Sequence, residues 1–208
     1  CGQKAFPRKV VPASLSCACP CAGQAALSPR GCARFPGASG YEANQLAKAA
    51  GGVEAAGAAF IDVNCGSRLK SECDDFLWLL DLIQEAVSVP LCLDSPDPKV
   101  LAAGLKQVEQ RPLINSITLE PDRFDEVAPI LEGDVADVIG LCMDETGIPN
   151  TTEKTFENAV GLVKKLEALE LKRSSIYLDP LIQPLSTDTE NGNTALASIT
   201  TITESLSG

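Results

Sequence analysis

The stretch VPLCLDSPDPKVLAAGL (residues 89–105) contains one complete repeat of the pattern that decides the fold. Its apolar run VPLCL ends at Asp94, and Ser95 and Pro96 then mark the start of an amphipathic segment. A short strand that is apolar on both faces, followed by apolar residues at helical spacing, is typical of a buried parallel strand and the helix that covers it. This stretch therefore predicts one strand and one helix of a βα unit.

The same pattern recurs along the chain from about residue 41. The expected strands are AAFIDVN, VPLCLD, RPLINS, ADVIGLCMD and SSIYLDP, and the expected helices cover about 42–57, 71–87, 97–108, 121–132, 153–169 and 192–206. Five strands that are each followed by a helix predict an α/β fold with a parallel sheet. No glycine-rich nucleotide-binding motif occurs at a strand-to-helix turn, which disfavours a dinucleotide-binding domain, although a doubly wound sheet fits the same pattern.

Composition excludes several classes of function. The net charge of −11 argues against nucleic acid or an anionic membrane surface as a partner. No apolar run approaches the roughly 20 residues that span a bilayer. The chain contains no histidine, which removes Ser-His-Asp and Cys-His catalysis and the usual imidazole metal ligand. We therefore expect carboxylates, amides, hydroxyls or thiols to carry the function, with no bound metal.

Residues 1–40 differ in composition from the rest of the chain. They contain five basic and no acidic residues, five prolines and five of the nine cysteines. We expect a disordered or non-native segment, such as a misread upstream frame, although a transit peptide also fits this composition. The spacing of Cys17, Cys19 and Cys21 matches no common zinc site. Because no secretory segment precedes the globular part, we expect reduced thiols and a cytoplasmic location.

Polar residues end every predicted strand. They are Asp62 and Asn64 after the first strand, Asp94 after the second, Asn115 after the third, Asp144 after the fourth and Asp179 after the fifth. In a parallel barrel the carboxyl ends of all strands meet at one mouth, where active sites form. Residues of this kind also cap helices, and Ser95 and Ser116 fit that simpler role. A ring of carboxylates and amides suits a polar heterocycle with several N–H donors.

Five segments together resemble a known family. They are IDVNCGS (61–67), VPLCLDSPDPKVLAAGL (89–105), PLINSIT (112–118), VIGLCMDETGIP (138–149) and IYLDPLIQP (176–184). They are similar, in order and spacing, to the methyltetrahydrofolate:corrinoid/iron–sulfur protein methyltransferases. That family belongs to a pterin-binding group with dihydropteroate synthase and the folate domain of cobalamin-dependent methionine synthase. The resemblance implies a partial pterin-binding domain over residues 41–208, namely an incomplete TIM (β/α)8 barrel.

The resemblance also implies roles for individual residues. It assigns pterin-ring hydrogen bonds to Asp94, Asn115 and Asp179, supporting positions to Asp62 and Asn64, and a nearby position to Asp144. The chemistry agrees, because a carboxylate can accept both the amino group and the adjacent ring N–H of a pterin. The implied reaction transfers the N5 methyl of methyltetrahydrofolate to, or from, the cobalt of a corrinoid (cobalamin) that a partner protein carries. A homodimer is also implied.

Two departures from the family lead to further expectations. Nothing in residues 1–40 matches the family's first strand, and the Asn that would contact N5 would lie beyond Gly208. We therefore expect a fragment that lacks the first and the last two strands of the barrel, with weak activity and limited stability. The alternatives are a dihydropteroate synthase, the folate module of a methionine synthase, and an inactive remnant.

Overall fold

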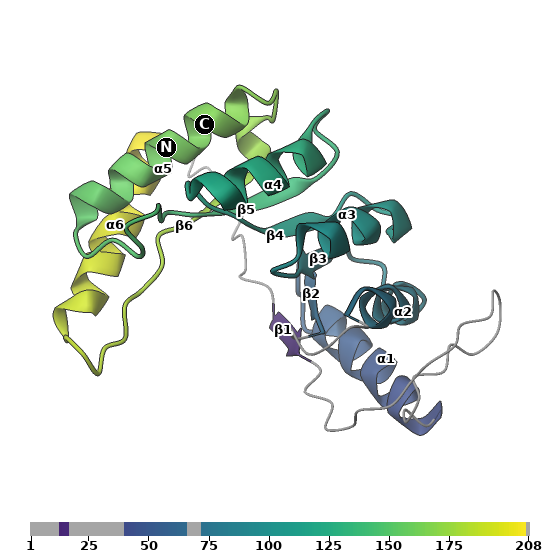
Figure 1. Cartoon of the computed structure of the whole chain (residues 1–208). Coiled ribbons are helices and arrows are strands. Elements are labelled where there is room, and N and C mark those ends of the chain that lie inside the picture. Colours follow the sequence, from purple (N-terminus) through teal and green to yellow (C-terminus); the bar gives the residue numbers. More distant parts are fainter. Residues whose placement is uncertain (1–12, 17–39, 66–71, 207–208) are drawn as a thin grey trace, which may run out of the picture. The chain divides into compact units, whose positions relative to one another are not determined.

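The computed structural model describes residues 13–16, 40–65 and 72–206, in which strands and helices alternate (Figure 1). The strands that were predicted are β2 Ile61–Asn64, β3 Leu91–Asp94, β4 Leu113–Ile117, β5 Asp137–Leu141 and β6 Ile176–Asp179. The helices are α1 Gly40–Ala55, α2 Glu72–Gln84, α3 Pro98–Gln107, α4 Pro121–Leu131, α5 Thr152–Glu167 and α6 Glu190–Leu206. The predicted alternation and the α/β class are confirmed, whereas the incomplete eight-stranded barrel stays a prediction.

The described residues form two compact units. The first unit comprises residues 1–95 and 103–112, and the second comprises residues 96–102 and 113–208, so that α3 contributes residues to both. All strand pairs within the units are parallel: β2 pairs with β3 in the first, and β5 pairs with both β4 and β6 in the second. Within the described ranges, no helix is long and apolar enough to cross a membrane.

One strand was not predicted. Residues Ala13–Ser16 form β1, which pairs in parallel with β2, with Ala13 opposite Ile61 and Ser16 opposite Asn64. The expectation that no strand precedes β2 is therefore wrong for these four residues. The segment ASLS is too short, and too poor in β-branched and aromatic residues, to stand out as a strand. The rest of the prediction for residues 1–40 falls almost entirely outside the described part of the chain.

The core of the first unit lies between the strands and α2. The helix places the fully buried side chains of Phe76, Leu80 and Ile83 on one face, at the spacing that an amphipathic helix requires. Gly104 of α3 sits against this cluster, because a Cβ built there would lie 2.8 Å from Phe76 Cε1 and 3.3 Å from Leu93 Cδ1. The apolar side chain of Leu93 therefore faces the helices.

The core of the second unit follows the same plan. Leu162 and Leu166 of α5 are fully buried, and a Cβ at Gly140 of β5 would lie 3.3 Å from Leu162 Cδ1. The absence of a side chain at Gly140 thus lets α5 pack closely on the sheet. Thr151 caps α5, since its hydroxyl oxygen accepts a hydrogen bond from the Lys154 N–H at 3.2 Å. Helices α5 and α6 pack against each other (Figure 1).

Candidate functional site

The first unit carries polar side chains on one face of β2 and β3. Asp62 lies opposite Cys92 in the parallel register, and the next residues on the same face are Asn64 and Asp94. Side chains alternate between the two faces of a strand. Because Leu93 faces the helices, these four polar residues point to the opposite face of the sheet. Strands β2 and β3 therefore turn apolar side chains towards the helices and polar side chains towards the other face of the sheet.

Two predicted site residues meet on this face. The side-chain amide of Asn64 donates a hydrogen bond from Nδ2 to Asp94 Oδ2 at 2.6 Å. Asp62 is only 6% exposed, and its Oδ1 accepts no hydrogen bond from any described residue. A buried oxygen without a partner costs about 1–3 kcal/mol, so Asp62 Oδ1 is an acceptor that suits a donor from a ligand. These carboxylate acceptors thus fit a molecule with N–H groups.

The cysteines near the predicted site are poor nucleophiles. Burial raises the pKa of the Cys92 thiol far above its usual value, and the neighbouring carboxylates of Asp62 and Asp94 add to the rise. Burial, and then the charge of Asp179, raise the pKa of Cys142 to about 12. A thiol attacks as its thiolate, which neither residue forms near neutral pH. Both cysteines therefore act as small buried side chains.

In the second unit, Asn115 and Asp179 share one face of the sheet. Asn115 of β4 lies opposite Ile139 of β5, which lies opposite Tyr177 of β6, and Asp179 follows Tyr177 by two residues. The opposite face packs on α5 through Gly140. Both polar side chains are half-buried, and Asp179 Oδ1 accepts the Leu181 N–H at 2.8 Å. Asn115, in the middle of β4, and Asp179, at the end of β6, thus lie on the side of the sheet away from α5.

Asp144 has a different set of contacts. Its Oδ1 accepts hydrogen bonds from the Thr146 N–H at 2.9 Å and the Thr146 hydroxyl at 2.6 Å, and its Oδ2 lies 2.9 Å from Lys154 Nζ. The Thr146 hydroxyl, followed by Lys154, lowers the pKa of Asp144 to about 2. Both oxygens are therefore engaged in holding the loop after β5 to the first turn of α5. These contacts favour a structural role, and pterin contact by Asp144 stays a prediction.

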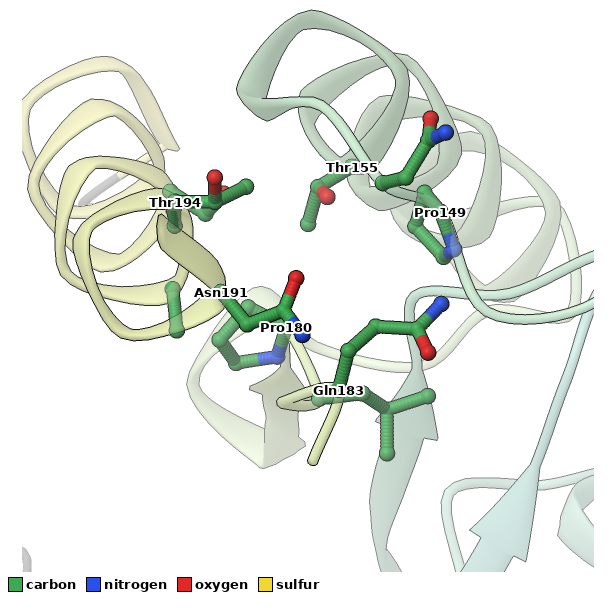
Figure 2. Close-up of a pocket in the computed structure, with 10 residues that line it drawn as sticks. Pro149, Thr155, Pro180, Gln183, Asn191 and Thr194 are labelled. Atoms are coloured by element: carbon green, nitrogen blue, oxygen red, sulfur yellow. The ribbon is translucent and has the colours of Figure 1, made fainter. Parts of the chain in front are cut away.

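A small hollow lies beside this part of the second unit (Figure 2). It encloses about 240 Å³, including space open to solvent, between the loops after β5 and β6 and helices α5 and α6. The side chains around it include Pro149, Thr155, Pro180, Gln183, Asn191 and Thr194. None of its lining residues in the described part of the chain is charged, and neither Asp144 nor Asp179 is among them. The hollow therefore has a neutral lining, and it borders Asp179 through Pro180 and Leu181, which follow it in the chain.

Three residues that sequence reasoning did not single out bind the loops and strand ends of the second unit. Lys154 binds Asp144, and Gln183 Nε2 donates to the Ile148 carbonyl at 3.1 Å. Arg123 donates to the Ser116 carbonyl near the end of β4 and to the Pro96 carbonyl before α3. Their partners lie 7 to 35 positions away in the sequence or are backbone atoms, for which a local pattern gives no signal.

The structure brings together part of the predicted site. Asn64 and Asp94 are in contact in the first unit, whereas Asn115 and Asp179 share a face in the second. The grouping of Asp94, Asn115 and Asp179 around one hollow stays a prediction. Among the described residues, no cluster of three or more cysteine, aspartate or glutamate side chains is placed to hold a metal ion.

Comparison with known proteins identifies relatives with related names. A methylcorrinoid:tetrahydrofolate methyltransferase of Eubacterium limosum is 35% identical over 135 residues, which is 64% of this chain and 50% of that protein. A methionine synthase of Mycobacterium tuberculosis (strain ATCC 25618 / H37Rv) is 30% identical over 122 residues, which is 56% of this chain and 10% of that protein. A methionine synthase of Mycobacterium leprae (strain TN) is 31% identical over 109 residues, which is 50% of this chain and 9% of that protein.

These alignments set the scale of the likeness. The chain spans half the length of the Eubacterium limosum protein that it matches and about a tenth of each methionine synthase. The model of the pterin-binding enzyme family matches residues 34–207, which include every predicted site residue. This match covers most of the chain, and the chain therefore belongs to the pterin-binding enzyme family.

Proposed function

We propose that the chain binds a reduced folate through Asp94, Asn115 and Asp179, with Asp62 and Asn64 in support. The observation that carries the proposal is the polar face of the first unit, where Asp62 Oδ1 is buried beside the Asn64–Asp94 pair with no donor among the described residues. A pterin offers adjacent N–H donors, and each hydrogen bond to a carboxylate contributes roughly 1.5–3 kcal/mol. The family match over residues 34–207 supports the same ligand class.

The reaction that we propose is methyl transfer between N5 of methyltetrahydrofolate and the cobalt of a corrinoid on a partner protein. The name of the Eubacterium limosum relative supports this reaction. The corrinoid supplies the cobalt that accepts or gives up the methyl group. The described residues would bind and orient the pterin. The buried thiols of Cys92 and Cys142 argue against a covalent cysteine intermediate, because both have raised pKa values.

Titration calorimetry with tetrahydrofolate tests the binding step. The wild-type chain should bind, and Asp94→Asn should weaken the affinity roughly ten- to hundredfold, because one charge-assisted hydrogen bond becomes neutral. Asp179→Asn should have an effect of similar size. The matched control is Asp125→Asn, since Asp125 is exposed on α4. A wild-type chain that does not bind tetrahydrofolate, or an Asp94→Asn variant that binds as tightly as the control, would contradict the proposal.

Methyl transfer itself is measured with cob(I)alamin and methyltetrahydrofolate, through the absorbance change as methylcobalamin forms. The second candidate is the folate module of a methionine synthase, which the two mycobacterial relatives favour. A module of that kind should pass the methyl group to a cobalamin domain of methionine synthase added in trans. A methyltransferase of the first kind should prefer a separate corrinoid protein. The ratio of the two rates therefore separates the candidates.

A further inference from the structure

The guanidinium group of Arg123, in the first turn of α4, contacts the backbone carbonyls of Ser116 in β4 and Pro96 before α3. Its Nε and Nη2 donate hydrogen bonds to the Ser116 carbonyl oxygen at 3.1 and 2.8 Å, and its Nη1 donates to the Pro96 carbonyl oxygen at 2.7 Å. All of these atoms belong to the second unit. A rigid guanidinium fork can make this set of bonds at once, whereas a lysine ammonium presents a single point of charge.

The bond to Ser116 falls where the strand ladder is irregular. Asn115 pairs with Ile139 and Ile117 pairs with Gly140, so that the pairing of β4 with β5 shifts at Ser116. A residue at such an irregularity has no place in the regular ladder and needs another partner to fix its backbone. Arg123 supplies two N–H donors to the Ser116 carbonyl. The peptide unit between Ser116 and Ile117, one residue beyond Asn115, is therefore held by a side chain from α4.

We infer that Arg123 is a positioning residue for Asn115. The inference rests on the proposed function, in which the Asn115 side chain binds the pterin. The amide of Asn115 must point in one direction to donate and accept at a pterin edge. Its backbone is fixed on one side by the ladder with Ile139 and on the other by Arg123 at Ser116. Without the Arg123 guanidinium group, the backbone at Ser116 loses its side-chain partner, and the Asn115 amide adopts several orientations.

The experiment compares tetrahydrofolate affinity in Arg123→Ala, Arg123→Lys, Asn115→Ala and the double variant of the full chain. Arg123→Ala should weaken binding about tenfold or more, and Arg123→Lys should recover part of the loss. The matched control is Arg173→Ala, because the Arg173 guanidinium also makes two bonds, to Glu167 Oε1 at 2.8 and 2.7 Å, away from the strand ends. The control should bind within about twofold of the wild type.

A double-mutant cycle separates positioning from a general loss of structure. If Arg123 acts through Asn115, its removal should add little once Asn115 is alanine, so that the double variant binds like Asn115→Ala alone. Fully additive effects, or wild-type affinity in Arg123→Ala, would overturn the inference. Arg123→Lys keeps the charge and most of the packing, and it carries the test should Arg123→Ala fail to fold. A wild-type chain that does not bind tetrahydrofolate removes the proposed function and the inference together, whereas wild-type binding with an unaffected Arg123→Ala removes only the inference.

Discussion

The Asn64–Asp94 contact predicts a pH-dependent loss of stability in Asn64→Asp. The amide donates to Asp94 Oδ2 at 2.6 Å, so the substitution brings two carboxylates within hydrogen-bond distance. At an effective dielectric constant near 20, two such charges repel by about 4 kcal/mol. One proton shared by the pair removes the repulsion and restores a hydrogen bond, which raises the upper pKa of the pair by about 3 pH units.

The sign of the pH dependence follows from that raised pKa. The folded variant binds a proton more tightly than the unfolded chain, so its stability increases as the pH falls from about 7 towards 4. We expect Asn64→Asp to lose about 4 kcal/mol of unfolding free energy at pH 7.5 and about 1.5 kcal/mol at pH 5. Urea titration followed by the fluorescence of Trp78, the single tryptophan, measures both values in the first unit.

The chain offers a matched control for this experiment. Asn193 Nδ2 donates to Glu190 Oε2 at 2.9 Å, which is the same amide–carboxylate pair on the exposed surface of α6. Water screens that pair, so Asn193→Asp should change the stability by less than about 0.5 kcal/mol at either pH. The reasoning is refuted if Asn64→Asp loses no more stability than Asn193→Asp at pH 7.5, or if its loss is equal at the two pH values.

Three further predictions concern packing, acid and thiol chemistry. Gly104→Ala should lower the free energy of unfolding, measured in urea, by about 1–2 kcal/mol, because its Cβ would lie 2.8 Å from the buried ring of Phe76. The control is Gly52→Ala in α1, whose Cβ meets nothing within 4 Å and should raise the free energy of unfolding by about 0.5–1 kcal/mol. The stability that comes from Asp144, whose pKa is about 2, should be present above pH 4 and lost as the pH falls to 2, and Asp144→Asn should remove this part of an acid titration followed by circular dichroism. Cys142, whose pKa is about 12, should resist iodoacetamide at pH 8 until the chain is unfolded, as peptide mass spectrometry would detect.

The alternation of strands and helices was predictable because it depends on local periodicity. Apolar runs such as the one ending at Asp94 recur with helical patterns between them, and these patterns place each strand, although β5 ends at Leu141, three residues before the predicted end at Asp144. The start of α3 shows the limit of local reasoning. Ser95 was a candidate cap; its hydroxyl donates to Glu72 Oε1 at 2.6 Å, and Asp97 Oδ1 accepts the Lys99 N–H at 2.8 Å. The partner of Ser95 lies in another helix, which a local pattern cannot indicate.

The candidate site also has contacts that local sequence patterns could predict and contacts that they could not. The alignment of Asn64 with Asp94 could be expected, because both end neighbouring parallel strands. The contacts of Asp144 could not, since Lys154 lies ten positions further along the chain and reaches back only because α5 begins at Thr152. Arg123 belongs to the same class, because its acceptors are backbone oxygens that carry no residue-specific signal. Residue types thus indicated the polar side chains near the strand ends, whereas the contacts that hold these regions depend on tertiary packing.

The loop between β5 and α5 is held unequally along its length. At its start, an ion pair and two hydrogen bonds join Asp144 to Lys154 and Thr146. At Ile148, an exposed hydrogen bond from Gln183 joins it to the loop after β6. A neutral exposed hydrogen bond contributes only about 1 kcal/mol, so thermal motion opens it often. The part of the loop around Ile148, which borders the hollow, is therefore held less firmly than the part around Asp144.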